Sequence, residues 1–540
     1  MTPGRRRLRR LLLFLLLAAA AHADAREAVS AKRYIVAAAH PLAVEAGVEM
    51  LAKGGSAMDA AIAVQMVLGL VEPESSGIGG GAFLLYWSEE EKALRSYDGR
   101  ETAPAAARRD RFLKDGKPMG FLDAAVGGRS VGVPGVLAML ELAHRKHGRL
   151  PWAQLFQPAI RIAEQGFEAS PRLRELLEGE KRLREDPGAR ALYYREGRAV
   201  ARVVNREYAA TLRRLAAEGA AAMYRGKIAE GIVRAATARG GDVTLQDLAS
   251  YKALEREPVC APYRQYRVCS MGPPSAGGIA VLQILGILER TAFDKAQPRS
   301  PQAVHLFAEA GKLAYADRAR YGADGDFVPV PVAKLLGKNY LDRRAKLITD
   351  RAMPLAPPGD TEASGTSHFS IADAHGNVLA MTTTIEAAFG SRVMAGGFHL
   401  NNELTDFDFL PGGANEVAAG KRPRSSMAPV IVFDRDGRVR MALGSPGGPW
   451  IINYVAKTLI AMIDWKLDPQ AAIDVPNFGS RNGPTVLEEG APASLVEALK
   501  ARGHETQFAR LPSGLHAIER VADGWRGGAD SRREGEARGR

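Results

Sequence analysis

A change from a helix-rich to a strand-rich pattern near residue 365 constrains the fold of this chain more than any other sequence feature. Residues 351–365 read RAMPLAPPGDTEASG, and this proline-, glycine- and serine-rich segment without an apolar period indicates an exposed connector. Directly after it, HFSIAD (368–373) and VLAMTTTI (378–385) have the composition of strands, and the AHGN between them is a strong turn signal. The sequence therefore predicts a β-hairpin at the end of the connector.

The regions on both sides of this hairpin predict different elements. Helical spacing of apolar residues predicts helices over 41–71, with a break at Gly54-Gly55 and Ser56 as N-cap, and over 130–235 and 301–320. After the hairpin, the pattern predicts strands at 393–400, 428–435 and 439–444, and then helices at 450–463 and 468–473. This order is not a simple βαβ alternation, so we expect an α+β fold with sheets covered by helices. The polar, glycine-rich tail 526–540 is expected to be disordered.

Composition excludes two classes of protein. The chain has 540 residues, of which 46% are hydrophobic and 25% are charged, values typical of a folded soluble protein and not of a disordered one. Two cysteines are too few for a small disulfide scaffold. The formal net charge of +12 says little about partners until its position is known.

Part of this positive charge lies at the N-terminus. The stretch RRRLRR at residues 5–10 is followed by an apolar run over 11–21 and by Ala21-His22-Ala23, which together are typical of a secretory signal peptide over residues 1–23. The alternative is an uncleaved membrane anchor, for which the apolar run is short. We expect a periplasmic or secreted protein that loses five arginines with its signal, and no nucleic-acid partner.

The two cysteines have two interpretations. Cys260 and Cys269 flank APYRQYRV, which predicts two short strands around a turn and places the thiols where they can face each other. Export makes a disulfide possible, but two free thiols fit the sequence equally well.

The hairpin brings two hydroxyl groups together. With its turn centred on His375-Gly376, Ser367 is expected opposite Thr384, so that Thr366 becomes a close neighbour of Thr384. A threonine that starts a strand after a cleavable connector is where an N-terminal nucleophile is expected, because its own α-amine serves as the base once the preceding peptide is cut. From geometry alone, the more common alternative is an ordinary β-forming threonine.

A series of motifs carries a resemblance that decides between these alternatives. Residues 34 to about 530 resemble the γ-glutamyltransferase family of N-terminal nucleophile hydrolases. The motifs that carry the resemblance are, in order, GGSAMDAAIAV, GIGGGAF, DGRETAPAAA, GVPGV, GPPSAGG, AYADRARY, GTSHFSIADAHGNVLAMTTTIEAAFGS, NNELTDFDF, KRPRSSMAP and GSPGG. The resemblance implies a four-layer αββα sandwich built jointly by two autoprocessed subunits, 24–365 and 366–540.

The resemblance also implies the catalytic residues. Thr366 is expected to be the nucleophile, released by cleavage after Gly365, and Thr384 to hydrogen-bond to it. Gly447 and Gly448 are expected to form the oxyanion hole. They precede a helix that is predicted to start near Trp450, where free backbone N–H groups favour an anion.

Six further residues match positions that bind the glutamyl group in the family. Arg100 and the pair Ser425 and Ser426 are expected to bind its carboxylate, and Asp406 its ammonium. Without the resemblance, the simpler interpretation is that Arg100 forms a surface ion pair with Glu101 or Asp98. Ser425 and Ser426 would then belong to a simple turn. Glu386 and Glu403 replace Asn and Gln of better-known members, so we expect an acidic pocket with Arg100 facing the three carboxylates across it.

Two other departures concern reactivity. Gly365 replaces the Gln or Glu that commonly precedes the nucleophile, and glycine removes steric resistance to a strained peptide. Only a short stretch separates Asp406 from Lys421, where many members insert a lid loop. An open pocket would favour hydrolysis over transfer and would accept larger acyl groups.

The resemblance implies an enzyme that transfers γ-glutamyl groups from glutathione and related compounds to water, amino acids or peptides, with no cofactor. No metal site is expected, since His144 and His147 lack a completing cluster and fit a solvated face. Two alternatives remain: an acylase for cephalosporin or glutaryl amides with the same nucleophile, and an unprocessed, non-enzymatic binding protein.

Overall fold

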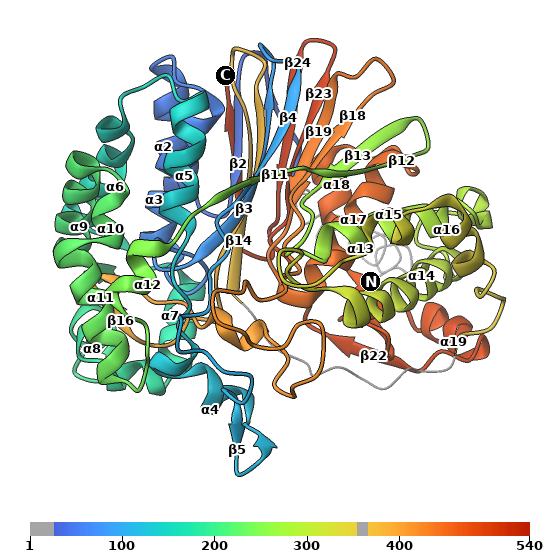
Figure 1. Cartoon of the computed structure of the whole chain (residues 1–540). Helices are drawn as coiled ribbons and strands as arrows, with labels where there is room; N and C mark the ends of the chain where they lie inside the picture. Colours follow the sequence, from blue (N-terminus) through green and yellow to red (C-terminus); the bar gives the residue numbers. More distant parts are fainter. Residues whose placement is uncertain (1–25, 354–364) are drawn as a thin grey trace, which may run out of the picture.

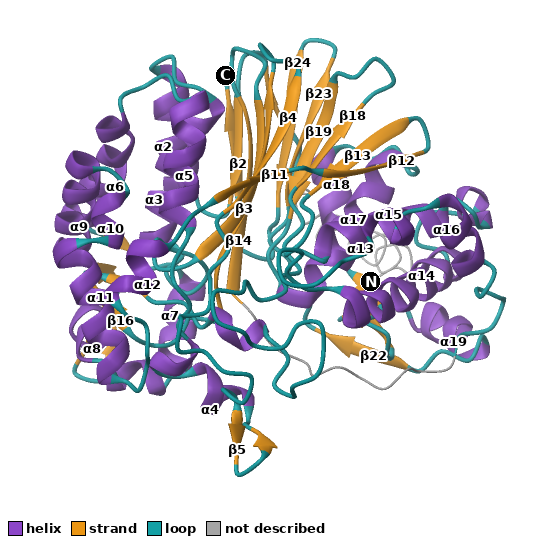
Figure 2. Ribbon diagram, in the orientation of Figure 1, coloured by secondary structure: helices purple, strands orange, loops and turns teal. Residues whose placement is uncertain are grey.

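Two antiparallel sheets pack face to face in the middle of the molecule, and a layer of helices covers the outer face of each (Figure 2). This arrangement is seen in the computed structural model, which describes residues 26–353 and 365–540. It is the αββα sandwich that the family resemblance implies. None of its described helices is long and apolar enough to cross a membrane.

The sheet that holds the hairpin has seven strands and alternates between segments that lie before and after the connector. Its order is β11 (Leu254–Arg256), β4 (Ala93–Asp98), β3 (Gly81–Ser88), β15 (Val378–Glu386), β14 (Gly365–Ala372), β2 (Ile35–Ala38) and β25 (Glu536–Gly539). The predicted hairpin, β14 with β15, therefore lies between strands of the N-terminal part. Neither part of the chain forms this sheet alone.

The second sheet also combines both parts. Its order is β1 (Val29–Ala31), β24 (Gly524–Ala529), β23 (His516–Val521), β19 (Val439–Gly444), β18 (Val430–Phe433), β13 (Tyr266–Ser270) and β12 (Val259–Tyr263). Apolar side chains of the two inner faces, such as Trp87 and Phe433, pack between the sheets. Burial of this layer removes apolar surface from water and fixes how the sheets face each other.

Each sheet packs against its own group of helices (Figure 1). The hairpin sheet is covered by α2 (Pro41–Ala52), α3 (Ala57–Val71), α5 (Val136–His147), α6 (Gln157–Gln165) and α9 (Arg206–Glu218). The second sheet is covered by α13 (Gly277–Leu288), α14 (Pro301–Tyr321), α17 (Ile451–Ile463) and α18 (Pro469–Asp474). The predicted break in 41–71 is confirmed: Gly54 has a positive φ of 85°, and Ser56 forms a capping box with Asp59 at the start of α3.

The region 393–400 is not the single strand that its composition predicts. Two-residue strands β16 (Met394–Ala395) and β17 (Phe398–His399) pair there around Gly396 and Gly397, both with positive φ. A Cβ at Gly397 would lie 2.4 Å from the backbone nitrogen of Tyr208, so only glycine allows this turn to approach α9.

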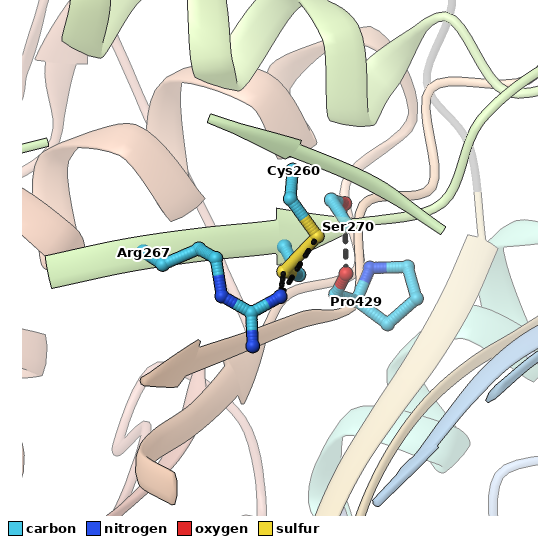
Figure 3. The surroundings of a disulfide bond; sticks show 5 residues. Cys260, Arg267, Ser270 and Pro429 are labelled. Atoms are coloured by element: carbon cyan, nitrogen blue, oxygen red, sulfur yellow. Dashed lines mark hydrogen bonds between the residues drawn. A yellow bond between two sulfur atoms is a disulfide. The ribbon is translucent and has the colours of Figure 1, made fainter. Parts of the chain in front are cut away.

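The two cysteines form a disulfide, which resolves the alternative that the sequence leaves open. Cys260 on β12 and Cys269 on β13 are direct cross-strand partners in an edge hairpin, with Cα atoms 4.1 Å apart (Figure 3). Arg267, also on β13, places its guanidinium 3.5 Å from the Cys269 sulfur. The disulfide closes the outer hairpin of the second sheet.

The tail 526–540 is ordered, and the prediction of disorder is wrong. Residues Glu536–Gly539 form β25, which pairs with β2 at the edge of the hairpin sheet. The side chain of Arg533 is buried and donates a hydrogen bond to the Thr366 backbone carbonyl at 3.0 Å. Polar, glycine-rich composition indicates disorder only when no neighbouring strand is available, and here an unpaired sheet edge provides one.

Candidate active site

Thr366 lies at the start of the central strand β14 and contacts Thr384 on the adjacent strand β15. Both residues are buried, and the Thr366 hydroxyl hydrogen-bonds to the Thr384 hydroxyl at 3.4 Å. The predicted proximity of these two side chains is confirmed. Thr384 also accepts a hydrogen bond from the Glu386 backbone N–H at 2.8 Å, which fixes its hydroxyl beside Thr366.

The register that produces this contact differs from the predicted one. Ser367 pairs with Thr383 and not with Thr384, because the turn is one residue longer than expected and is closed by Asp373, whose carboxylate accepts the N–H groups of His375 and Asn377. A bulge between Gly365 and Ser367 then shifts the pairing by one residue. The bulge places Thr366 out of the regular ladder, where its hydroxyl meets Thr384.

Gly448 of the glycine pair lines the same pocket as Thr366. Gly447 and Gly448 have φ values of 129° and 52°, and a short 3-10 turn, Gly448–Trp450, leads into α17. The first backbone N–H groups of a helix have no acceptor within that helix, so this turn can hold an oxyanion. Tyr315 of α14 donates a hydrogen bond to the Pro449 carbonyl and fixes the turn from the other side.

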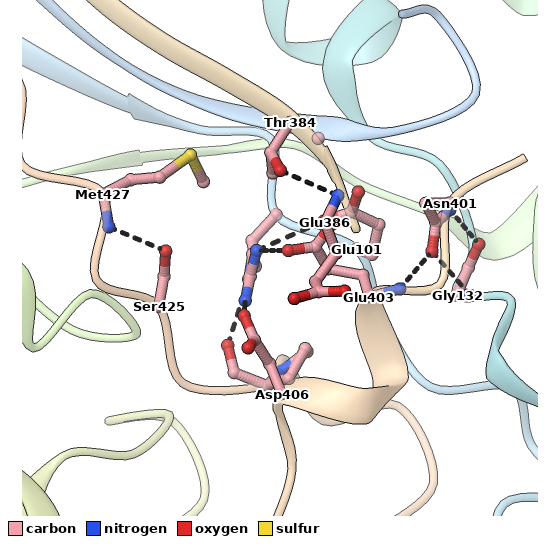
Figure 4. A network of polar contacts seen from close by, with 12 residues as sticks. Glu101, Gly132, Thr384, Glu386, Asn401, Glu403, Asp406, Ser425 and Met427 are labelled. Carbon is pink, nitrogen blue, oxygen red and sulfur yellow. Dashed lines mark hydrogen bonds and ion pairs between the residues drawn. The ribbon is translucent and has the colours of Figure 1, made fainter. Parts of the chain in front are cut away.

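Arg100 forms ion pairs with a cluster of carboxylates, Glu101, Glu403 and Asp406, which Figure 4 labels. Its side chain is fully buried and forms ion pairs with Glu403, with Asp406 at 2.5 Å and with Glu101 at 3.8 Å. Arg100 was expected to face the carboxylates across the pocket, but it contacts two of them directly, Glu403 and Asp406. The alternative of a surface ion pair is also wrong, because the Arg100 side chain is fully buried. A desolvated guanidinium needs counter-charges at contact distance, and the acidic residues supply them.

This cluster changes the acidity of its members. Burial raises the pKa of Glu403 to about 7, although Arg100 opposes the shift, and the nearby Asp406 adds to it. Burial, with Glu403 next in size, also raises the pKa of Glu101 well above its ordinary value. Burial alone would lower the pKa of Arg100, but Glu403, Asp406 and Glu101 together raise it, so Arg100 stays charged.

The remaining predicted residues complete the same pocket. Glu386 lies at the end of β15 with a φ of 76° and accepts a hydrogen bond from Asn402. Ser425 accepts the Met427 backbone N–H at 3.1 Å, and Ser426 accepts a hydrogen bond from Arg318 at 2.6 Å. One pocket is lined by all the predicted residues except Gly447, which precedes the lining residue Gly448: Arg100, Thr366, Thr384, Glu386, Glu403, Asp406, Ser425, Ser426 and Gly448.

Sequence reasoning missed three residues here. Arg318 lines the pocket and lies within the AYADRARY motif, but the motif assigns it no role. Arg533, which holds the Thr366 carbonyl, lies in the tail that was expected to be disordered. Glu101 is expected from the sequence only as a surface partner of Arg100, but it is fully buried. Long-range packing, which no local pattern reveals, buries Glu101 and Arg533 and half-buries Arg318.

The stretch between Asp406 and Lys421 folds back on itself beside the pocket. Asn415 donates a hydrogen bond to the Asp406 carbonyl at 2.7 Å and accepts the Arg424 backbone N–H at 2.8 Å. Phe407 and Val417 are buried in a small apolar cluster with Ala103. Among the described residues that line the pocket, none comes from 407–424.

The comparisons with known proteins agree with this geometry. The gamma-glutamyltranspeptidase family model matches residues 43–539. The chain belongs to the gamma-glutamyltranspeptidase family. The glutathione hydrolase proenzyme of Bacillus subtilis (strain 168) is 36% identical, with 94% of this chain and 91% of the relative covered.

Acylases are equally similar. The acylase ACY 1 proenzyme of Pseudomonas sp. (strain SE83) is 37% identical, with 93% of this chain and 92% of the relative covered. The crystal structure of a cephalosporin acylase from Bacillus halodurans superposes with a TM-score of 0.86 at 29% identity, covering 95% of this chain and 97% of the acylase. Membership of the gamma-glutamyltranspeptidase family establishes an enzyme with the N-terminal nucleophile hydrolase fold, and two of these relatives are named as proenzymes.

Proposed function

We propose that this protein cleaves itself between Gly365 and Thr366 and then hydrolyses γ-glutamyl amides such as glutathione. The main support is the position of Thr366, the second residue of β14, whose hydroxyl lies beside that of Thr384. Thr366 also lines one pocket together with Gly448, Arg100 and Asp406. The Thr366 hydroxyl attacks the Gly365 carbonyl carbon, the peptide nitrogen leaves as the new α-amine, and water opens the ester. The cut releases residues 24–365 and 366–540 as two subunits.

The same hydroxyl then acts on the substrate. The free α-amine of Thr366 accepts the hydroxyl proton while the oxygen attacks the γ-glutamyl amide carbon. The N–H groups at Gly447 and Gly448 stabilise the negative charge on the carbonyl oxygen. The amine product leaves with a proton, and water, an amino acid or a peptide takes the acyl group from Thr366.

We also propose that the protein is exported to the periplasm or secreted. The support is the pattern of residues 1–23, which lie outside the described residues, together with the disulfide of Cys260 and Cys269. Disulfides persist in oxidising compartments.

An acylase is the second candidate function. It is favoured by the coverage and TM-score of the cephalosporin acylase structure, and by the absence of residues 407–424 from the described pocket lining. We propose that such a pocket favours water over acceptor amines and admits acyl groups larger than γ-glutamyl.

One set of measurements tests these proposals. Intact mass and N-terminal sequencing of the small subunit are expected to give Thr366 as its first residue, and Thr366→Ala is expected to remain a single chain without activity. Hydrolysis of γ-glutamyl-p-nitroanilide and glutaryl-p-nitroanilide, with and without glycylglycine, separates the two activities. Full activity of Thr366→Ala would refute the role of Thr366 as the nucleophile. Preferential transfer of the acyl group to glycylglycine at ordinary concentrations would refute the proposal that hydrolysis outweighs transfer.

A further inference from the structure

The ladder of the hairpin sheet is irregular at the start of β14. On the β15 side, a bulge shifts the register between Gly365 and Ser367. On the other side, the described pairing of β14 with β2 covers only Phe369–Ala372. Ladder hydrogen bonds hold a strand less firmly at a bulge than in a regular stretch. Contacts from outside the sheet therefore contribute to the position of this end of β14.

One such contact is a buried hydrogen bond at Ser367. The Ser367 hydroxyl donates to Glu72 Oε2 at 3.0 Å and accepts a hydrogen bond from the Ser76 hydroxyl at 3.3 Å. Ser367 is fully buried, and the side chain of Glu72 is only 1% exposed. Hydrogen bonds to ionised groups are roughly twice as strong as those between neutral groups, and burial protects this one from competing water.

Glu72 is itself held in place by Arg172, which lies in the first turn of α7 (Pro171–Gly179). Arg172 Nη1 lies 3.0 Å from Glu72 Oε1 and also forms an ion pair with Glu74. The two carboxylate oxygens of Glu72 thus have separate partners, Arg172 at Oε1 and Ser367 at Oε2. This chain of contacts joins α7 to the start of the central strand.

The segment that carries Glu72 also holds the neighbouring strand β15. The Ser75 carbonyl accepts the Ile385 backbone N–H at 3.3 Å. Ile385 directly follows Thr384 in the chain, just as Ser367 directly follows the expected nucleophile. The segment therefore contacts the residue that follows each of the two active-site threonines, and it links their positions.

We propose that Glu72 is a positioning residue: its carboxylate, held by Arg172, fixes Ser367 and so places the Thr366 hydroxyl for self-cleavage and for attack on the substrate. This inference rests on the proposed action of Thr366. Glu72 is not among the described residues that line the pocket, so it acts through Ser367 and not on the substrate. Because a displacement of about 1 Å can slow a reaction about 100-fold, the contact affects rates more than substrate binding.

Ser367→Ala and Glu72→Gln test the contact from its two ends. Ser367→Ala removes only a hydroxyl group, and in Glu72→Gln the guanidinium of Arg172 keeps Glu74 as its counter-ion. Both variants are expected to slow self-cleavage of the precursor about 10-fold, the size expected for one lost hydrogen bond to a charged group, and to lower kcat with little change in KM. Ser367→Thr keeps the hydroxyl and is expected to restore both rates.

A double-mutant cycle separates positioning from a general loss of stability. The effects of Ser367→Ala and Glu72→Gln on the self-cleavage rate are expected to be non-additive, because both changes remove the same hydrogen bond. Ser370→Ala is the matched control: Ser370 is buried on the same strand, but its hydroxyl hydrogen-bonds to His368. Additive effects, native rates in Ser367→Ala, or equal slowing in Ser370→Ala would overturn the proposal.

Amide hydrogen exchange gives a readout that needs no chemistry at Thr366. In the uncleaved Thr366→Ala precursor, the added change Glu72→Gln is expected to speed exchange of the amides of residues 366–368 but not of residues 369–372, which β2 also holds. If the native protein is inactive and this exchange still rises, the Thr366 chemistry is wrong while the contact between Glu72 and Ser367 stands. If the native protein is active and Glu72→Gln changes neither exchange nor self-cleavage, the chemistry stands and Glu72 has no positioning role.

Discussion

The pocket changes the pKa of the Glu403 carboxyl group, and this change has a testable effect on the stability of the protein. Its pKa is raised to about 7 in the folded protein, above the ordinary value of 4.5. Between these two values the folded state binds more protons than the unfolded state, so stability falls as pH rises from about 4.5 to 7. The cause is burial of the carboxylate, which the ion pair with Arg100 only partly offsets.

The neutral variant Glu403→Gln is expected to remove this pH dependence. The melting temperature of the variant should fall less than that of the native protein between pH 5 and pH 7.5, as measured by calorimetry at both values. Glu497→Gln, on an exposed face of α19 (Ala493–Ala501), is the control and should follow the native profile. Equal slopes for native protein and Glu403→Gln would contradict the raised pKa.

Arg533 is a positioning residue, since it holds the backbone carbonyl of Thr366 without reaching the reacting hydroxyl. Arg533→Met is expected to slow self-cleavage and to lower kcat by about 10-fold, the size expected for one lost charge-assisted hydrogen bond, with little change in KM. Time-resolved gel electrophoresis of the precursor and steady-state kinetics measure the two effects.

The neighbour of Arg533 offers a matched control. Arg532 forms ion pairs with Glu488 at 2.5 Å and Asp530 at 3.2 Å and does not contact Thr366. Arg532→Met is therefore expected to lower the melting temperature without the selective loss of kcat. If both variants lose stability and kcat in parallel, Arg533 has only a structural role.

At the scale of elements, the hairpin of β12 and β13 depends on its disulfide. Cys260 and Cys269 cross-link the outermost pair of strands, and the sequence separation of 9 closes a short loop. The double variant Cys260→Ser, Cys269→Ser is expected to lose about 2–3 kcal/mol of unfolding free energy, because the cross-link restricts the unfolded chain.

Denaturant unfolding with and without a reducing agent measures this loss. Activity should be unchanged, because neither cysteine is among the residues that line the pocket. Reduction should destabilise the native protein to the level of the double variant and leave the variant itself unaffected. A native protein that is insensitive to reduction would show that the cross-link contributes nothing.

At the scale of the whole molecule, the two expected subunits are interleaved in both sheets. In the hairpin sheet, β14 lies between β15 and β2, and β25 pairs with β2 on its other side. Separating 24–365 from 366–540 would break the hydrogen bonds of these strands and expose the apolar layer between the sheets.

The processed subunits are therefore expected to stay together in native buffer and to separate only in denaturant. Gel filtration should give one peak that resolves into two bands on a denaturing gel, and thermal unfolding should show both subunits melting in one transition. Elution of the two bands at different volumes in native buffer would contradict the interleaved sheets.

Local patterns predicted the elements that local physics determines. Helix α3 follows from the capping residue Ser56 and its apolar spacing, and the hairpin of β14 and β15 follows from β-forming residues around a turn. The resemblance supplied the site positions, and the structure places nearly all of them around one pocket. The register, however, was wrong by one residue, since the Asp373 turn and the bulge beside Thr366 are not visible in composition.

The sequence by itself determined most of the strands and helices, with the region 393–400 and the tail 526–540 as exceptions. It also determined where the chain changes character near residue 365 and which residue types are present for chemistry. Only the tertiary structure decided that the tail carrying Arg533 is ordered and that Arg100 is already neutralised by Glu403 and Asp406. The physical reason is that propensities and caps act between neighbours in the sequence. Burial, sheet-edge pairing and charge compensation depend on residues that are hundreds of positions apart.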